Sequence, residues 1–152
     1  TDNTKQKHID TFVETLDDID VAGYSFISGG DLNSIPPGAE VYDFCLTDIC
    51  PGNEYHTDTD GGPHREGSYF NNFDEERALL EDLYNAFNPA IPLYEAVTNR
   101  HFTHSTASEY PWDRKLDYLF TNLAVVENSG QTHQNTIMLS DHAPVTARVT
   151  LP

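Results

Sequence analysis

One short segment constrains this chain more than any other, because an apolar run ends there in a glycine pair and a carboxylate. Residues 24–27 (YSFI) lead into residues 28–33 (SGGDLN), and the turn formers of residues 36–38 (PPG) follow. An apolar run bounded by glycines predicts a short buried strand that turns at a sheet edge. There Asp31 is suited to orient or deprotonate a water, and Asn33 to donate a hydrogen bond to an anionic oxygen. The same residue types also form ordinary turns, so this segment alone leaves both interpretations open.

A second carboxylate lies in a predicted strand of the C-terminal third. Residues 114–120 (RKLDYLF) alternate Leu, Tyr and Phe against Asp117 and a second Leu. This period of two predicts a strand with a carboxylate on one face. A structural role is also open, because Asp117 could pair with Arg114 or Lys115.

A third segment, residues 140–145 (SDHAPV), places an acid directly before an imidazole. Asp141 and His142 precede a predicted closing strand over residues 145–149. Asp141 could instead cap a turn. The order of the three segments along the chain favours a functional role over three unrelated turns and strands.

In that order, residues 30–33 (GDLN), 115–120 (KLDYLF) and 140–144 (SDHAP) resemble the motifs of the endonuclease/exonuclease/phosphatase superfamily. This superfamily of metal-dependent phosphoesterases includes DNase I-like nucleases, inositol polyphosphate 5-phosphatases and bacterial sphingomyelinases. The resemblance implies an α+β fold, here half of a four-layer αββα sandwich with mostly antiparallel or mixed sheets and flanking helices. Residues 1–152 would form the C-terminal part of one such domain. The earlier family motifs, including a metal-binding Glu, would precede Thr1, so we expect an N-terminal half of the same domain as a partner.

The resemblance also implies roles for individual residues. Asp31 would position or deprotonate the attacking water, and Asn33 would hold that water or a phosphoryl oxygen. His142 would face the phosphate, with Asp117 hydrogen-bonded to its other ring nitrogen. Asp141 and Asp31 would bind the metal, and oxygen ligands favour Mg²⁺ or Mn²⁺.

Three further residues are candidate substrate contacts. His104 lies in a predicted strand that begins at residues 101–104, and a His there could reach a phosphate or serve the structure alone. Trp112 and Arg114 lie on the predicted loop before the Asp117 strand, where packing is the equal alternative.

Charge narrows the class of substrate. The chain carries 8 Lys and Arg against 25 Asp and Glu, a formal net charge of −17. Such a chain repels polyanions, so duplex nucleic acid is disfavoured. We expect a phosphodiesterase or phosphomonoesterase acting on a small or lipid-linked phosphate ester. A secreted nuclease and a non-catalytic binding domain of the same fold are the alternatives. No apolar run approaches the length of a transmembrane segment.

Two helices are predicted from apolar spacing. The first spans residues 4–19 with Ile9 and Leu16 on its apolar stripe, and the second begins near Asn72, runs through Leu80 and Leu83, and stops before Pro89. Residues 89–98 read as a connector, residues 123–126 as a strand, and residues 129–136 as a polar hairpin or loop.

The long polar stretch between these helices, residues 34–73, is placed to shape a substrate pocket. Its residues 56–66 (HTDTDGGPHRE) could bind a second metal, but the spacing does not fit an EF-hand, and a solvated acidic loop is favoured. Cys45 and Cys50 would form a small-loop disulfide in an exported protein and stay thiols in a cytosolic one. Secretion or a periplasmic location is the favoured expectation for the compartment.

Overall fold

The computed structural model describes residues 4–39, 73–104, 112, 114–136 and 139–152. The chain mixes helices with antiparallel sheets, which confirms the α+β class. The longer elements, in chain order, are α1 (Thr4–Val21), β1 (Ile27–Asp31), α2 (Phe73–Ala86) and β3 (Asp117–Thr121). The shorter ones are β2 (Asn88–Pro89), α3 (Leu93–Ala96), η4 (Asn99–His101), β4 (Ala124–Val125), β5 (Gln131–Thr132), η5 (Gln134–Thr136), β6 (Val145–Thr146) and β7 (Val149–Thr150).

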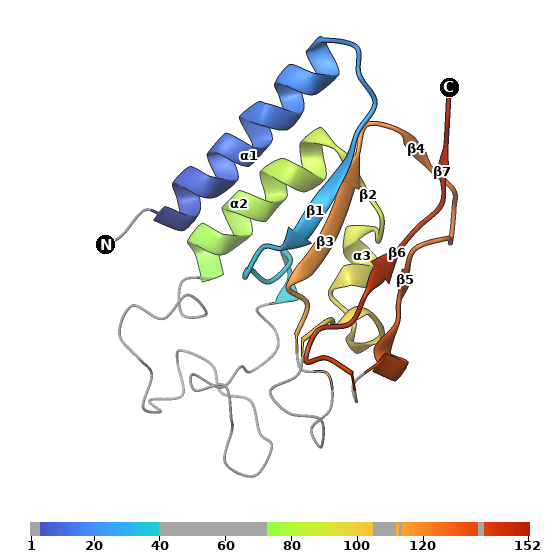
Figure 1. Ribbon diagram of the computed structural model, residues 1–152. Helices are drawn as coiled ribbons and strands as arrows, with labels where there is room; N and C mark the ends of the chain where they lie inside the picture. The colour runs from blue at the N-terminus through green and yellow to red at the C-terminus, as the bar shows by residue number, and fades with distance from the viewer. Residues whose placement is uncertain (1–3, 40–72, 105–111, 113, 137–138) are drawn as a thin grey trace.

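The main sheet has three strands in the order β1-β3-β2, so β3 lies in the centre. Helices α1 and α2 lie side by side along one side of this sheet, whereas α3, β5 and β6 lie on the other (Figure 1). The core between the helices and the sheet consists of Ile9, Leu16, Phe26, Leu80, Leu83, Phe87, Tyr118 and Phe120. Burial of these side chains fixes which face of β3 points toward the helices, and therefore which face carries Asp117.

Both helices follow the predicted apolar spacing. Ile9 and Leu16 of α1 are buried, as are Leu80 and Leu83 of α2. Helix α2 ends at Ala86, before the proline, as predicted. No helix in the described part of the chain is long and apolar enough to cross a membrane.

The prediction of a buried strand over residues 24–31 was wrong in its burial and its start. Strand β1 begins at Ile27, whose side chain is 58% exposed, and Tyr24 is exposed as well. Only Phe26 of this run is buried, because it packs against the helices just before the strand begins. Ile27 lies opposite Thr121, on the face of the sheet that carries Asp117, and this face points away from the core between the sheet and the helices.

Three other predicted segments differ from the structure. Residues 101–104 are not a strand, because His101 ends the 3₁₀ helix η4 and only His104 makes bridges, to Arg114 and His142. The predicted connector over residues 89–98 contains the short helix α3. The predicted closing strand is split into β6 and β7, which pair with different partners, β5 and β4.

The other sequence predictions are met in part. Strand β4 lies within residues 123–126, and residues 129–136 contain β5 and η5. Cys45, Cys50 and the acidic stretch of residues 56–66 lie outside the described residues.

Candidate active site

The register between β1 and β3 places two carboxylates directly opposite each other. Asp31 is the cross-strand partner of Asp117, 86 positions later in the chain. The next residue, Leu32, donates its N–H to the carbonyl of Leu116 at 2.9 Å. Because antiparallel pairs alternate, Asp31 and Asp117 form the non-hydrogen-bonded kind of pair, in which the side chains lie closest. Like charges in that position destabilise a sheet, so the pair calls for a cation or a proton donor between or beside its members.

Gly29 permits this close approach of the two strands. A Cβ atom at this position would overlap the backbone carbonyl oxygen of Tyr118 in β3. The close contact between β1 and β3 therefore requires a glycine at position 29. Without it, Asp31 and Asp117 could not keep their register at the same separation.

The loop after β1 is fastened to Asp31 itself. Asn33 donates its backbone N–H to Oδ1 of Asp31 at 2.8 Å and its side-chain amide to Oδ2 at 3.1 Å. Asn33 has a φ of 50°, a left-handed conformation that Asn tolerates better than most residues. The turn and the candidate catalytic loop are thus one structure, in which Asn33 orients the carboxylate of Asp31.

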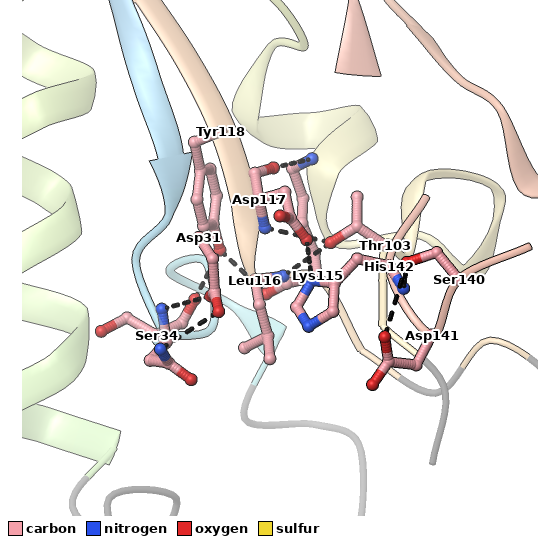
Figure 2. A network of polar contacts seen from close by, with 11 residues as sticks. Asp31, Ser34, Thr103, Lys115, Leu116, Asp117, Tyr118, Ser140, Asp141 and His142 are labelled. Carbon is pink, nitrogen blue, oxygen red and sulfur yellow. Dashed lines mark hydrogen bonds and ion pairs between the residues drawn. The ribbon is translucent and has the colours of Figure 1, made fainter. Parts of the chain in front are cut away.

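Ser34, the residue after this turn, is hydrogen-bonded to a side chain of the central strand. Tyr118 is buried on the helix side of β3, and its hydroxyl lies 2.7 Å from the carbonyl oxygen of Ser34. The same hydroxyl lies 3.0 Å from the carbonyl oxygen of Lys115. This contact ties the loop that follows Asp31 to the strand that carries Asp117 (Figure 2).

His142 completes the group. Its Nδ1 lies 2.8 Å from Oδ2 of Asp117, as a hydrogen bond or an ion pair according to the protonation of the ring. The backbone N–H of His142 donates to the Ser140 hydroxyl at 3.0 Å, which shapes the turn that presents the ring. Figure 2 shows Asp31, Asp117 and His142 gathered at one end of the β1–β3 pair, with Asp141 beside them.

The carboxylates favour a charged imidazole at this place. Partial burial of the ring would lower the pKa of His142. The hydrogen bond and charge of Asp117, followed by the charges of Asp31 and Asp141, outweigh burial and raise the pKa above its ordinary value. A protonated His142 would relieve the repulsion between Asp31 and Asp117.

The same group is suited to a metal ion. One oxygen of Asp31, one oxygen of Asp117 and one ring nitrogen of His142 all lie within 4.8 Å of one another. Carboxylate oxygens fit hard divalent ions such as Mg²⁺ or Mn²⁺, which complete their shell with water. The Asp117–His142 hydrogen bond occupies Nδ1 and Oδ2, so in this arrangement those two atoms hold a proton rather than an ion. Asp141, the other expected metal ligand, is exposed next to His142 and outside the group of three.

The expected substrate contacts are placed differently from one another. His104 lies against His142, with ring centroids 5.2 Å apart in an edge-to-face arrangement. Trp112 is partly buried and donates its indole N–H to the carbonyl of Gln134 at 2.9 Å. Arg114 is 1% exposed, so its side chain lies inside the protein. The structure thus places His104 at the site. Trp112 is bonded to another part of the fold, and Arg114 is buried.

Two buried polar residues support Asp117: Thr103, which no sequence motif indicated, and Lys115, which the sequence suggested only as a possible pairing partner of Asp117. Thr103 accepts the backbone N–H groups of Leu116 and Asp117 on its hydroxyl, at 2.9 and 3.0 Å. Lys115 donates its ammonium to the carbonyl of Asp117 at 2.9 Å and lies over the Tyr118 ring. Burial, opposed by the charge of Asp117, lowers the pKa of Lys115 to about 7. Lys115 lies two residues before β3, so its role depends on how this segment packs and not on a strand pattern.

Comparison of this chain with protein-family models, curated proteins and solved structures found no match.

Proposed function

We propose that this chain carries catalytic residues of a metal-dependent phosphoesterase that hydrolyses a small or lipid-linked phosphate ester. The observation that supports this most is the pairing of Asp31 and Asp117 across two strands, with Nδ1 of His142 2.8 Å from Asp117. A sheet gains nothing in stability from two facing carboxylates, so a functional demand for charge explains them better than folding does.

A DNase I-like sandwich is the finer fold that we propose for the domain. Helices α1 and α2 would form an outer layer of a DNase I-like sandwich, and the β1-β3-β2 sheet would form the inner layer that they cover. The complete domain, as the family resemblance defines it, would also have a preceding half that supplies a further metal-binding Glu.

Hydrolysis needs an oriented water, and Asp31 is the residue proposed to provide it. Its carboxylate is exposed at the end of β1 and is oriented by the two hydrogen bonds from Asn33. An ionised carboxylate so held can accept a proton from water while the water attacks phosphorus. Asn33 would add a polar contact to the water or to a phosphoryl oxygen.

His142 would stabilise the charge that develops on the phosphate. With Nδ1 bonded to Asp117, the ring can present Nε2–H to a non-bridging or leaving oxygen. Asp117 fixes the orientation of the ring and favours its protonated form, in the way that a carboxylate behind an imidazole does in other enzymes. His104, packed on the ring of His142, would be a second imidazole beside the phosphate.

The carboxylate of Asp31 would hold Mg²⁺ or Mn²⁺, and Asp141, which lies outside the group of three, would bind the ion through water. The ion, when bound, polarises the phosphate and supports the leaving oxygen. The negative net charge of this chain favours small or lipid-linked esters over duplex DNA.

The test is hydrolysis of bis-p-nitrophenyl phosphate by the complete domain with Mg²⁺ or Mn²⁺, beside nicking of plasmid DNA under the same conditions. We expect release of p-nitrophenol that requires the metal and stops when a chelator is added. Faster nicking than p-nitrophenol release would favour the nuclease alternative. No hydrolysis of either substrate, with either metal, would remove the catalytic proposal in favour of a binding domain.

A further inference from the structure

Thr103 stands where three segments of the candidate site meet. Its side chain is fully buried, and it lies just after η4 in a segment with no regular secondary structure. Its backbone N–H donates to the carbonyl of Arg114 at 2.8 Å, and its carbonyl accepts the N–H of Ala143 at 2.7 Å. The residue is therefore bonded both to the chain that leads into Asp117 and to the chain that follows His142.

The hydroxyl of Thr103 takes the place that a neighbouring strand would occupy. In the non-hydrogen-bonded pair with Asp31, the N–H and C=O of Asp117 point away from β1. Strand β2 pairs only with Phe120 and Thr121 at the other end of β3, so it does not reach Asp117. The Thr103 hydroxyl accepts the N–H of Asp117 at 3.0 Å, as well as that of Leu116 at 2.9 Å.

The carbonyl of Asp117 is held by a second buried group. Lys115, which is 1% exposed, donates to it at 2.9 Å. Both polar groups of the Asp117 backbone are thereby bonded to side chains that water does not reach, as Figure 2 shows for Thr103 and Lys115. Thr103 is also bonded to the chain next to His142, because its backbone carbonyl accepts the N–H of Ala143.

We propose that Thr103 is a positioning residue that holds Asp117 and His142 at hydrogen-bonding distance by bonding to the backbone on both sides of the pair. Groups that orient a catalytic imidazole or carboxylate typically change activity about 10- to 100-fold when removed. The expected effect on turnover rests on the proposed function. The expected effect on the Asp117–His142 hydrogen bond is independent of that function.

The test compares Thr103→Val with Thr103→Ser. Val has nearly the shape of Thr but accepts no hydrogen bond, whereas Ser keeps the hydroxyl. The matched control is Thr121→Val at the far end of β3, because Thr121 is also buried and its hydroxyl also accepts a backbone N–H, that of Leu123 at 3.0 Å. This control separates a general loosening of β3 from a local effect on the site.

The first readout is the NMR signal of the proton between Nδ1 of His142 and Asp117. We expect Thr103→Val to lose or broaden this signal and to speed hydrogen exchange of the Asp117 amide, while Thr103→Ser and Thr121→Val keep the signal. Retention of the signal in folded Thr103→Val, or its equal loss in Thr121→Val, would overturn the inference.

The second readout is turnover of bis-p-nitrophenyl phosphate by the complete domain. Thr103→Val should lower kcat about 10- to 100-fold with KM little changed, and Thr103→Ser should restore it. A kcat that is unchanged in Thr103→Val would count against the inference. Absence of turnover in the unmodified domain would instead contradict the phosphoesterase, and the NMR comparison would then decide the role of Thr103 by itself.

Discussion

The buried ammonium of Lys115 should make the stability of this protein rise with pH above neutrality. Its pKa lies at about 7 in the folded chain against 10.5 for a free Lys, chiefly because of burial. Between these values the unfolded chain binds a proton that the folded chain does not. Stability therefore increases as pH rises through this interval, and the full penalty of burying the charge applies below it.

The magnitude follows from the two pKa values. Integrating the difference in proton binding from pH 7 to pH 9 gives roughly 2 kcal/mol of added stability from this one residue. Lys115→Met keeps the apolar stem and removes the amine, so this contribution should vanish. Because the variant also loses the hydrogen bond from Lys115 to the Asp117 carbonyl, the test is the change in stability between the two pH values and not the stability at pH 7.

The assay is urea unfolding of the unmodified protein and of Lys115→Met at both pH values. Lys7→Met, at an exposed position of α1, is the control and should keep the pH dependence of the unmodified protein. Groups other than Lys115 that titrate in this range cancel in the comparison. If the free energy of unfolding changed equally with pH in the unmodified protein and in Lys115→Met, burial of the Lys115 ammonium would not destabilise the folded chain, and the argument would be refuted.

Three other changes test the fold and the pair of acids. Gly29→Ala should cost about 1–3 kcal/mol of unfolding free energy, because the new methyl group overlaps the Tyr118 carbonyl; unchanged urea stability would contradict the close approach of β1 and β3. Asp117→Asn should lower the pKa of His142, measured by NMR titration of the ring protons, and a pKa that stays put would show that the carboxylate does not govern it. Leu83→Ala, at a fully buried position of α2, should cost about 2–5 kcal/mol, and a calorimetric loss well below that would place Leu83 outside the core.

Local patterns were sufficient to predict the elements whose burial repeats along the chain. The apolar spacing around Ile9 and Leu16 predicted α1, and that around Leu80 and Leu83 predicted α2. The alternation around Tyr118 likewise predicted most of β3. In each case the burial of one face sets both the pattern and the structure.

Elements that depend on distant partners were predicted less well. The segment that leads into β1 is apolar in sequence, but Ile27 lies on the face of the sheet away from the core with the helices and is exposed. The closing segment divides into β6 and β7 because two different strands, β5 and β4, are available to pair with it. His101 lies in η4 and not in the predicted strand, and its ring contacts Glu95 and Thr132.

The candidate site shows the same division. Asp31, Asp117 and His142 were predicted from short motifs, and the structure brings them together. Their register, and the hydroxyl of Thr103 that supports it, depend on residues far apart in sequence and could not be derived from any local pattern.

The most direct test of the central claim is the rate at which the complete domain hydrolyses bis-p-nitrophenyl phosphate with Mg²⁺ when His142 is replaced by Ala. The exposed His8 of α1 is the matched control, as His8→Ala. We predict that His142→Ala lowers the rate at least about a hundredfold, or about 2.7 kcal/mol of barrier, without a change in fold by circular dichroism, while His8→Ala keeps the full rate. A near-normal rate in folded His142→Ala would contradict the account.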